Sequence, residues 1–437
     1  MQGTLSAGTK TRLAWGRREE RERSALHTVV VVGASLAGLR ASETLRREGF
    51  DGRVVLVGAE TDMPYDRPPL SKQFLAGDGE WKADAERLAL RQTSYDDLDL
   101  DLRLGTRARA LDVSRRRVAL AGDEELEFDG LVIATGSTPR TLAGIAPEGA
   151  APLEGVFLLR TLDDAIAIRE RLSSKPKVVV VGAGFIGSEV AATCRVRGLD
   201  VTVLEALPAP LVRGLGATLG MVCGELHRDH GVDLRLGVGV TAIEGDGRVE
   251  RVRLDDGSAV AADVVVVGVG VTPATEWLEG SGLRIDNGVV CDETLAAAPG
   301  IVAAGDVARW PNPLFDGELM RLEHWTNATE QGVAAARRLL HGDGDGTARE
   351  PFAPVPFVWS DQYDRKIQAA GHFRGDDEMH VVHGSLEERR FVALFGRAGR
   401  VVGALGCSMP AKVMQYRQMI ADRASLADAL ARARGGS

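Results

Sequence analysis

Residues 177–187 read Lys-Val-Val-Val-Val-Gly-Ala-Gly-Phe-Ile-Gly, a β-branched run that ends in three spaced glycines. The run predicts a strand at Lys177–Val181, and the residues after the glycines predict a helix at Ser188–Arg197. A glycine turn between a strand and a helix N-terminus is typical of a dinucleotide site, because a pyrophosphate can approach the free backbone N–H groups there. The residues predicted to contact the nucleotide in this turn are Gly182, Gly184, Ile186 and Gly187.

An acidic residue, Glu205, ends the next predicted strand, Asp200–Leu204. A carboxylate at this place can accept hydrogen bonds from both ribose hydroxyls of NAD and repels the 2′-phosphate of NADP. The pattern therefore favours NADH over NADPH, and the alternative is an ordinary acid at a strand end. A further strand at Val264–Val269 leads into Gly270, which we expect to complete the NAD site.

The same order of elements occurs earlier in the chain. A strand at Thr28–Val32 leads into Gly33-Ala34-Ser35-Leu36-Ala37-Gly38, followed by a helix at Leu39–Arg47 and a strand at Arg53–Val57. Ser35 replaces the middle glycine, and the acid expected after the second strand is displaced to Glu60. Taken alone, this turn fits a structural βαβ unit as well as a nucleotide site.

A distant segment favours the nucleotide interpretation of the first turn. Ile301–Ala304, within a strand-like segment that starts at Thr294, predicts a strand that delivers Asp306 beside Gly305, and Leu131–Ala134 predicts a strand that ends in Thr135-Gly136. In flavoproteins with a split FAD domain, such an aspartate accepts a hydrogen bond from a ribitol hydroxyl, whereas a purely structural role would be a helix N-cap. The residues predicted to contact FAD on these grounds are Gly33, Ser35, Gly38, Glu60, Thr135, Gly136 and Asp306.

Composition narrows the class of protein. The chain has 437 residues, a formal net charge of −9 and no apolar run long enough to span a bilayer, so we expect neither a nucleic-acid partner nor a membrane segment. Four widely spaced cysteines predict buried thiols in a reducing, cytoplasmic setting and no metal or iron–sulfur site. Residues 1–26 are rich in Arg and Glu and predict a disordered extension.

Four further segments are similar to the signature of one family. These segments are Pro64–Lys72, Leu159–Thr161, Glu323–Ala328 and Trp359–Tyr363. In the same order along the chain, they resemble segments of the oxygenase-coupled NADH-dependent ferredoxin reductases. That family belongs to the pyridine nucleotide-disulfide oxidoreductase superfamily, whose fold is like that of glutathione reductase. The resemblance covers about residues 27–430.

The family implies an α/β fold with two Rossmann-like dinucleotide-binding domains, each of the three-layer ββα type, and a smaller α+β C-terminal domain. The expected division is an FAD domain at 27–142 and 272–345, an NAD domain at 143–271 and a C-terminal domain at 346–437. The FAD contacts that the resemblance implies are Ala37, Lys72, Ala108, Arg160, Asp306 and Trp325.

Two of the implied site features have structural alternatives. We expect Lys72 to lie near the flavin and to form an ion pair with Glu189 on the first turn of the NAD-domain helix, and we give this pair the catalytic role. Two unrelated surface residues are the alternative. Trp325 is predicted to stack at the edge of the flavin or nicotinamide, although a plain core aromatic fits its sequence context as well.

The resemblance implies electron transfer from NADH through FAD to an iron–sulfur ferredoxin that serves a cytochrome P450 or a Rieske oxygenase. The chain is expected to act as a monomer or a homodimer. One alternative is an NADH-dependent reductase of a small acceptor such as a quinone, a peroxide or monodehydroascorbate. Another is a flavin-binding regulatory protein of the apoptosis-inducing-factor type.

Overall fold

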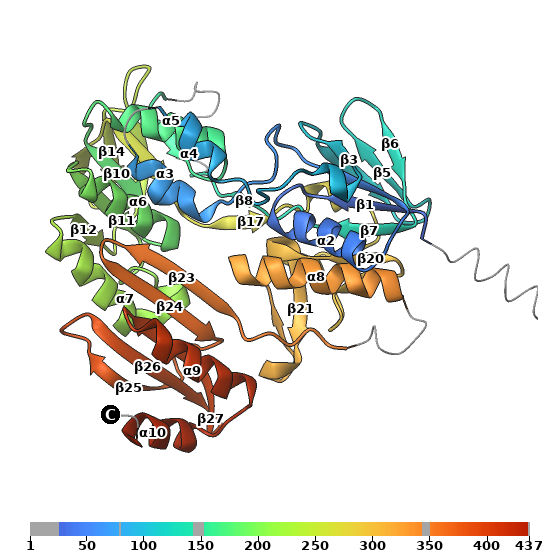
Figure 1. The fold of residues 1–437 in the computed structure, drawn as a ribbon. Helices are drawn as coiled ribbons and strands as arrows, with labels where there is room; N and C mark the ends of the chain where they lie inside the picture. Colours follow the sequence, from blue (N-terminus) through green and yellow to red (C-terminus); the bar gives the residue numbers. More distant parts are fainter. Residues whose placement is uncertain (1–25, 78–79, 143–152, 343–349, 436–437) are drawn as a thin grey trace, which may run out of the picture.

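A computed structural model of the chain describes residues 26–77, 80–142, 153–342 and 350–435. Nearly all of the predicted N-terminal extension lies outside these residues. Two sheets of mostly parallel strands lie side by side, and a third, antiparallel sheet follows at the C-terminal end of the chain (Figure 1). This arrangement confirms the predicted fold class.

The first sheet has six strands, which run parallel except for the edge strand β19. In spatial order they are β19 (Ala296–Ala298), β20 (Ile301–Ala303), β7 (Gly130–Ile133), β1 (Thr28–Val32), β2 (Arg53–Val57) and β3 (Leu100–Arg103). Helices α2 (Leu36–Arg47) and α8 (Trp325–His341) pack together against one face of the sheet. A three-stranded antiparallel ribbon adds a further layer, made of β4 (Ala108–Asp112), β5 (Arg117–Leu120) and β6 (Glu125–Glu127).

The second sheet has five parallel strands. In spatial order they are β12 (Asp233–Leu236), β11 (Val201–Glu205), β10 (Val178–Val181), β16 (Val264–Val267) and β9 (Val156–Leu158). Three helices of the described part of the chain pack against this sheet: α5 (Leu162–Leu172), α6 (Phe185–Val196) and α7 (Val212–Asp229). The antiparallel ribbon of this half consists of β13 (Val240–Glu244), β14 (Arg251–Leu254) and β15 (Ala259–Ala261).

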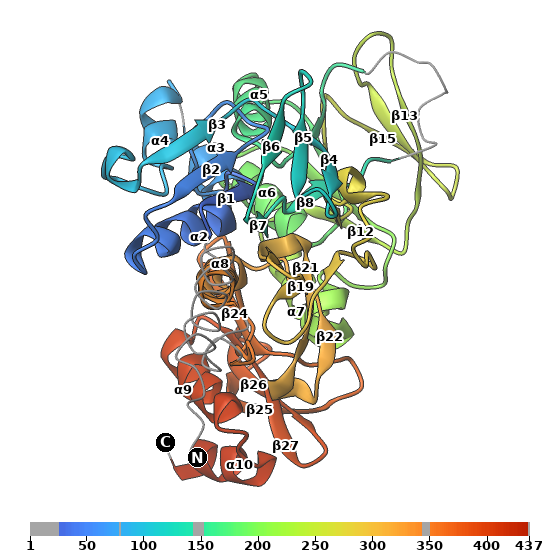
Figure 2. The same ribbon diagram turned by 90° about the vertical axis from the view of Figure 1, so that its right-hand side faces the viewer.

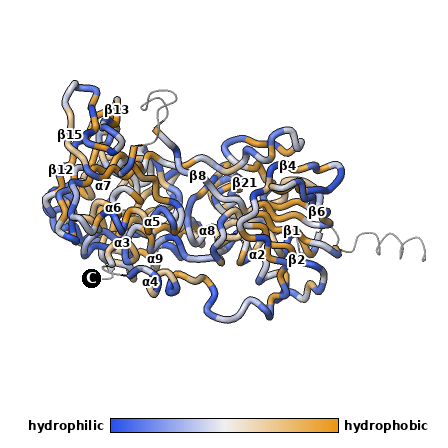
Figure 3. Tube along the Cα trace, turned by 90° about the horizontal axis from the view of Figure 1, so that it is seen from above, coloured by the Kyte–Doolittle hydropathy of each residue, from blue (hydrophilic) through white to orange (hydrophobic). Residues whose placement is uncertain are grey.

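Strand β10 shows how this second half is layered. Its alternate residues Val178 and Val180 pack in one cluster with residues of α5 and α6, while Val179 and Val181 pack in another with the β14–β15 ribbon. Successive side chains of a strand point to opposite faces of its sheet, so a run of four valines can fill both interfaces. In Figure 3 the first sheet around β1 and β2 is coloured mainly as hydrophobic, consistent with the burial of these two strands.

One segment leaves the first sheet after β2 and reaches the second half of the molecule. It carries the short helices α3 (Gln73–Ala76) and α4 (Lys82–Glu86), and α3 contacts α5 and α6 (Figure 1). The buried Arg169 of α5 donates to the Phe74 carbonyl at 2.9 Å and to Asp84 at 2.8 Å. These bonds fasten the segment to the second half.

Two further connections join the halves. Strand β8 (Ser137–Pro139) leaves the first sheet and pairs antiparallel with β17 (Val271–Pro273), by which the chain returns. The predicted boundary at 142/143 comes shortly after β8, and the one at 271/272 falls within β17. The small strands β18 (Val289–Val290), β21 (Ala308–Asn312) and β22 (Glu318–Met320) form a separate sheet.

The C-terminal sheet is wholly antiparallel. In spatial order its strands are β23 (Phe357–Gln362), β24 (Arg365–Gly371), β27 (Arg400–Cys407), β26 (Arg390–Arg397) and β25 (Glu378–Ser385). Helices α9 (Pro410–Ala421) and α10 (Leu426–Gly435) cover it. Figure 2 shows this unit at the end of the molecule away from β13 and β15.

The segment before Asp306 agrees with the prediction in part. The strand predicted at Ile301–Ala304 is β20, but the residues from Thr294 do not extend it: they contain the separate strand β19, which pairs with β20 as a hairpin, and a 3-10 turn at Gly305–Val307 contains Asp306. The reversal lies at Gly300, whose φ of 72° is in the left-handed region that glycine adopts easily.

Candidate functional site

One cavity of about 1610 Å³ lies between the two parallel sheets, and both glycine turns line it. Single small-molecule sites usually occupy roughly 300–1,000 Å³, so this cavity has room for more than one such ligand. Residues from both parallel sheets and from the C-terminal domain form its wall.

The second turn separates two uses of glycine. Gly182 has a φ of 98°, and a Cβ there would lie 2.5 Å from the Gly268 carbonyl oxygen, so a side chain cannot be accommodated. At Gly184 an added Cβ would meet no protein atom within 4 Å, because this residue faces the cavity. The turn therefore leaves a cradle open at Gly184, at the N-terminus of α6, where backbone N–H groups favour an anion.

The third glycine of each turn has a packing role. A Cβ at Gly187 would lie 2.0 Å from the Gly182 carbonyl oxygen, and one at Gly38 would lie 1.9 Å from that of Gly33. Neither Gly38 nor Gly187 lines the cavity. These glycines let the helix approach the strand closely, and their contact with a nucleotide stays a prediction.

Glu205 lies at the cavity wall at the end of β11. Its two carboxylate oxygens accept hydrogen bonds from the backbone N–H of Ala183 at 2.7 Å and of Leu207 at 2.9 Å. Each oxygen retains a further lone pair, so the side chain is held in place and can still accept from a ligand hydroxyl.

In the first turn, Gly33 has a φ of 122°, and a Cβ there would lie 2.0 Å from the Ala134 carbonyl oxygen. Ser35 precedes α2 and lines the cavity, and its side chain makes no capping hydrogen bond to the helix. The serine hydroxyl is thus free of the helix and faces the space that a middle glycine would leave open.

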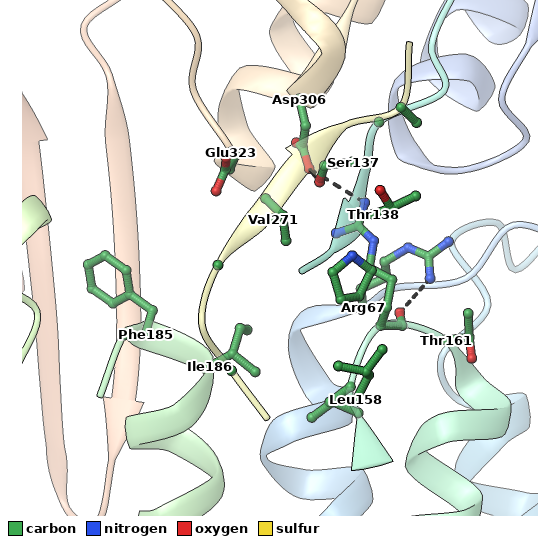
Figure 4. Close-up of a pocket in the computed structure, with 18 of the residues that line it drawn as sticks. Arg67, Ser137, Thr138, Leu158, Thr161, Phe185, Ile186, Val271, Asp306 and Glu323 are labelled. Atoms are coloured by element: carbon green, nitrogen blue, oxygen red, sulfur yellow. Dashed lines mark hydrogen bonds and ion pairs between the residues drawn. The ribbon is translucent and has the colours of Figure 1, made fainter. Parts of the chain in front are cut away.

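Asp306 is held by two groups from other segments. Ser137 donates its hydroxyl to Asp306 Oδ2 at 2.8 Å, and Arg160 Nη2 lies 3.5 Å from the same oxygen. Figure 4 shows Ser137 and Asp306 pointing toward one another, with Phe185 and Ile186 of the second turn elsewhere on the wall. Gly136, with a φ of 69°, keeps the chain next to the Arg160 guanidinium.

Glu60 is bound within the protein. Arg67 donates to its Oε1 at 2.5 Å, and Tyr65 donates its hydroxyl to Oε2. Burial raises the pKa of the Glu60 carboxyl, but the charge and hydrogen bond of Arg67 outweigh burial, and the net shift is downward. The carboxylate therefore stays charged. It could accept a hydrogen bond from a ribose only with the lone pairs that Arg67 and Tyr65 do not already use.

The predicted Lys72–Glu189 ion pair is present. Lys72 Nζ lies 2.7 Å from Glu189 Oε2, and both residues line the cavity. The same oxygen accepts from the Ser71 hydroxyl at 2.5 Å, and Oε1 accepts from the Ser360 hydroxyl at 2.8 Å. Lys72 also donates to the Pro68 carbonyl at 2.9 Å.

Trp325 lies at the cavity wall next to a second tryptophan, Trp359. It is half-buried at the cavity wall, and its indole N–H donates to Asp66 Oδ1 at 2.7 Å. Its ring meets that of Trp359 edge to face, with centroids 6.1 Å apart. The indole is therefore fixed in orientation at the wall and is not simply a core residue.

Several polar groups at the wall lack a partner among the described residues. They include His324 Nδ1, Arg321 Nε and Arg67 Nε, all inaccessible to solvent. Burial lowers the pKa of the His324 imidazole to about 4, so that this side chain is neutral near pH 7. Unpaired donors and acceptors around an open cradle fit a large polar ligand, and two dinucleotides suit both the volume and the two glycine turns.

None of the four cysteines lines the cavity. Cys194, Cys223, Cys291 and Cys407 are free and buried, and burial raises the pKa of each of the first three thiols to about 12. No cluster of metal-ligating side chains occurs among the described residues. The helices described there include none with the length and apolar character needed to cross a bilayer.

The cavity brings together most of the residues predicted from the sequence. Those that line it are Gly33, Ser35, Ala37, Glu60, Lys72, Ala108, Thr135, Gly136, Arg160, Gly182, Gly184, Ile186, Glu189, Glu205, Gly270, Asp306 and Trp325. Sequence reasoning missed Ser137, Arg67, Arg321 and His324. Arg67 and His324 stand inside segments already noted for their family resemblance, which was the available signal.

Comparison with known proteins agrees with this geometry. The family model described as pyridine nucleotide-disulphide oxidoreductase matches residues 27–332, and the model described as reductase C-terminal matches residues 357–434. Rhodocoxin reductase of Rhodococcus erythropolis is 40% identical over 397 residues, which cover 90% of this chain and 89% of that protein. Putidaredoxin reductase of Pseudomonas putida is 36% identical over 400 residues, with coverage of 90% and 92%.

Solved structures give the same result. The covalent putidaredoxin reductase–putidaredoxin complex matches with a TM-score of 0.85 and 33% identity, over 94% of this chain and 98% of that one. The ferredoxin reductase for the CYP199A2 system from Rhodopseudomonas palustris matches with a TM-score of 0.83 and 36% identity, over 91% and 95%. The chain therefore belongs to the pyridine nucleotide-disulphide oxidoreductase family, among the ferredoxin reductases of oxygenase systems.

Proposed function

We propose that this protein is an NADH-dependent ferredoxin reductase, which passes electrons from NADH through FAD to an iron–sulfur ferredoxin. One observation carries the proposal: two glycine turns from two parallel sheets open into one cavity, with a buried Lys72–Glu189 pair in its wall. Family membership with reductases of oxygenase systems supports the same activity.

The first turn is the proposed FAD site. Ser35 and Ala37 at the N-terminus of α2, together with Ala108, Thr135 and Gly136, would hold the nucleotide, and Asp306, which Arg160 contacts, would accept from the ribitol chain. When bound, the flavin supplies the chemistry that turns a two-electron donor into a one-electron donor. Lys72 places a positive charge at the cavity wall, and the ion pair with Glu189 fixes the position of its ammonium group.

The second turn is the proposed NADH site. Gly184 leaves space for the pyrophosphate, Gly270 and Ile186 flank it, and Glu205 is aimed to accept from the ribose. A negative charge at Glu205 repels a 2′-phosphate, which favours NADH over NADPH.

We propose the division into an FAD domain at 27–142 and 272–345, an NAD domain at 143–271 and a C-terminal domain at 346–437, with the site between the first two.

The electron acceptor is a ferredoxin, and through it a cytochrome P450 or a Rieske oxygenase. Similar proteins serve both a named dioxygenase system and the CYP199A2 system. Free, buried thiols favour a cytoplasmic setting. The scheme is compatible with either a monomer or a homodimer.

The test is NADH-driven reduction of cytochrome c with and without a purified ferredoxin. A ferredoxin reductase turns over rapidly and shows strong dependence on the ferredoxin. Equal rates without ferredoxin but with a quinone or peroxide would point to the small-acceptor alternative. Slow flavin bleaching whatever the acceptor would point to the regulatory alternative.

A further inference from the structure

Three parts of the chain meet at the Glu189 carboxylate. Ser71 and Lys72, on the segment after β2, donate to Oε2 at 2.5 and 2.7 Å. Ser360 on β23 of the C-terminal sheet donates to Oε1 at 2.8 Å. Among the described residues, therefore, the C-terminal domain holds one carboxylate oxygen and the FAD half holds the other.

Ser360 is buried completely and is not part of the cavity wall, whereas its neighbours Val358 and Trp359 are. Its hydroxyl oxygen accepts from the Gln362 side-chain amide at 3.2 Å. An amide N–H can only donate, so the Ser360 hydroxyl proton is left to point at Glu189. The network thus gives the serine a fixed orientation and a defined role as donor.

The geometry points to Ser360 as a positioning residue for the site: it fixes the Glu189 carboxylate, which in turn holds the Lys72 ammonium at the cavity wall. This inference rests on the proposed function, because it assigns Lys72 to the flavin. A carboxylate with partners on both oxygens cannot turn about its terminal bond without breaking a buried hydrogen bond. Lys72 also donates to the Pro68 carbonyl. If Glu189 turns away, the ammonium can shift toward that carbonyl and away from its place at the cavity wall.

Ser360→Ala removes the hydroxyl and leaves Glu189 Oε1 without its donor. In the FAD-loaded protein, stopped-flow mixing with saturating NADH is expected to show about a tenfold fall in the limiting rate of flavin bleaching, because small displacements of a positioned charge have effects of this order. The dissociation constant for NADH stays within about twofold of wild type, since Ser360 does not contact the NAD cradle. The midpoint potential of the bound flavin becomes more negative, because a positive charge beside it is less well held.

A control and a double-mutant cycle separate positioning from general damage. Ser385, on β25 of the same sheet, donates to the nearby Glu387, so Ser385→Ala is expected to leave both the bleaching rate and the potential unchanged. In a Glu189→Ala background, Ser360→Ala should change the rate by less than about twofold, because its partner is already absent.

The proposal is overturned if Ser360→Ala bleaches at the wild-type rate with the wild-type potential. It is equally overturned if the serine substitution has its full effect in the Glu189→Ala background. The proposed function fails in a different way, namely when NADH does not bleach the flavin of the unsubstituted protein.

Discussion

Lys72 Nζ and Glu189 Oε2 lie 2.7 Å apart although 117 positions separate the two residues in the chain. Their side chains are 11% and 3% exposed, so the ion pair is shielded from water. It joins the segment that leaves the first sheet to the helix that follows the second glycine turn. The contact that fastens the two halves together therefore also places a charge at the cavity between them.

Glu189→Gln is expected to destabilise the protein and to slow its reduction by NADH. The substitution leaves the Lys72 ammonium without its counter-ion in a buried place, which typically costs about 3–5 kcal/mol. Urea unfolding measures the loss of free energy. The matched control is Glu225→Gln, because Glu225 pairs with Arg228 on the surface and its loss should change stability by less than about 0.5 kcal/mol. Equal stability of the two variants would contradict the assigned role of the pair.

Two glycines of the second turn should respond differently to the same substitution. At Gly184 an added Cβ meets only the open cavity, so Gly184→Ala should keep the wild-type melting temperature and raise the KM for NADH at least about tenfold. At Gly187 the Cβ would collide with the Gly182 carbonyl, so Gly187→Ala should lower the melting temperature. A loss of stability in Gly184→Ala without any change in KM would show that the cradle is misassigned.

Asp306→Ala should produce a folded protein that retains little flavin. The carboxylate is expected to bind the ribitol chain, and its loss leaves Ser137 and Arg160 without their shared acceptor. The ratio of visible flavin absorbance to protein absorbance after gel filtration measures the effect. Asp316→Ala, which removes only a surface partner of Arg400, should retain the wild-type ratio. Full flavin content in Asp306→Ala would exclude this residue from the FAD site.

Glu205→Gln should reduce the preference for NADH. The amide keeps one acceptor oxygen, places its NH2 against one of the two backbone N–H donors and carries no charge, so repulsion of the 2′-phosphate is removed. We expect kcat/KM to fall about tenfold with NADH and to rise with NADPH, because one charged hydrogen bond is worth roughly 1.5–3 kcal/mol. Steady-state kinetics with both nucleotides test this. An unchanged ratio of the two kcat/KM values would mean that Glu205 does not read the ribose.

Stability should fall as the pH drops below 6.5. His227 is buried, and burial lowers its pKa to about 4, whereas the unfolded chain has the ordinary value near 6.5. The unfolded state therefore takes up a proton that the folded state does not, and the folded state loses free energy between these two pKa values, at up to about 1.4 kcal/mol per pH unit. His227→Gln should reduce this dependence in thermal unfolding measured from pH 7 to pH 4, and the part that remains is expected from His324, whose pKa burial also lowers to about 4. A variant with the wild-type slope would show that His227 is not responsible.

Local sequence was enough for the central strands of both sheets, but not for the edge strands β3, β9 and β12. Strands β1 and β2 occupy the predicted residues, because β-branched runs buried on both faces have few alternatives. The helices after the turns begin earlier than predicted, at Leu36 and Phe185, because turn residues already adopt helical geometry.

Contacts between distant segments were beyond the sequence patterns. Ser137 donates to Asp306 across 169 positions of the chain, and Ser360 donates to Glu189 across 171 positions. For neither serine does the local sequence indicate which distant residue it will contact. The third glycines illustrate the converse limit. Their spacing marks the turn, yet only the backbone geometry shows that an added Cβ at Gly38 or Gly187 would collide with the carbonyl oxygen of the first glycine of the turn.

The most direct test of the shared cavity is anaerobic stopped-flow mixing of the FAD-loaded protein with NADH, followed at the visible flavin band. If both nucleotides lie in one cavity with their rings in contact, a single equivalent of NADH bleaches the flavin in one rapid phase without any added protein. Binding of NADH with no bleaching, or bleaching only after a second protein is supplied, would show that the two cradles do not face each other.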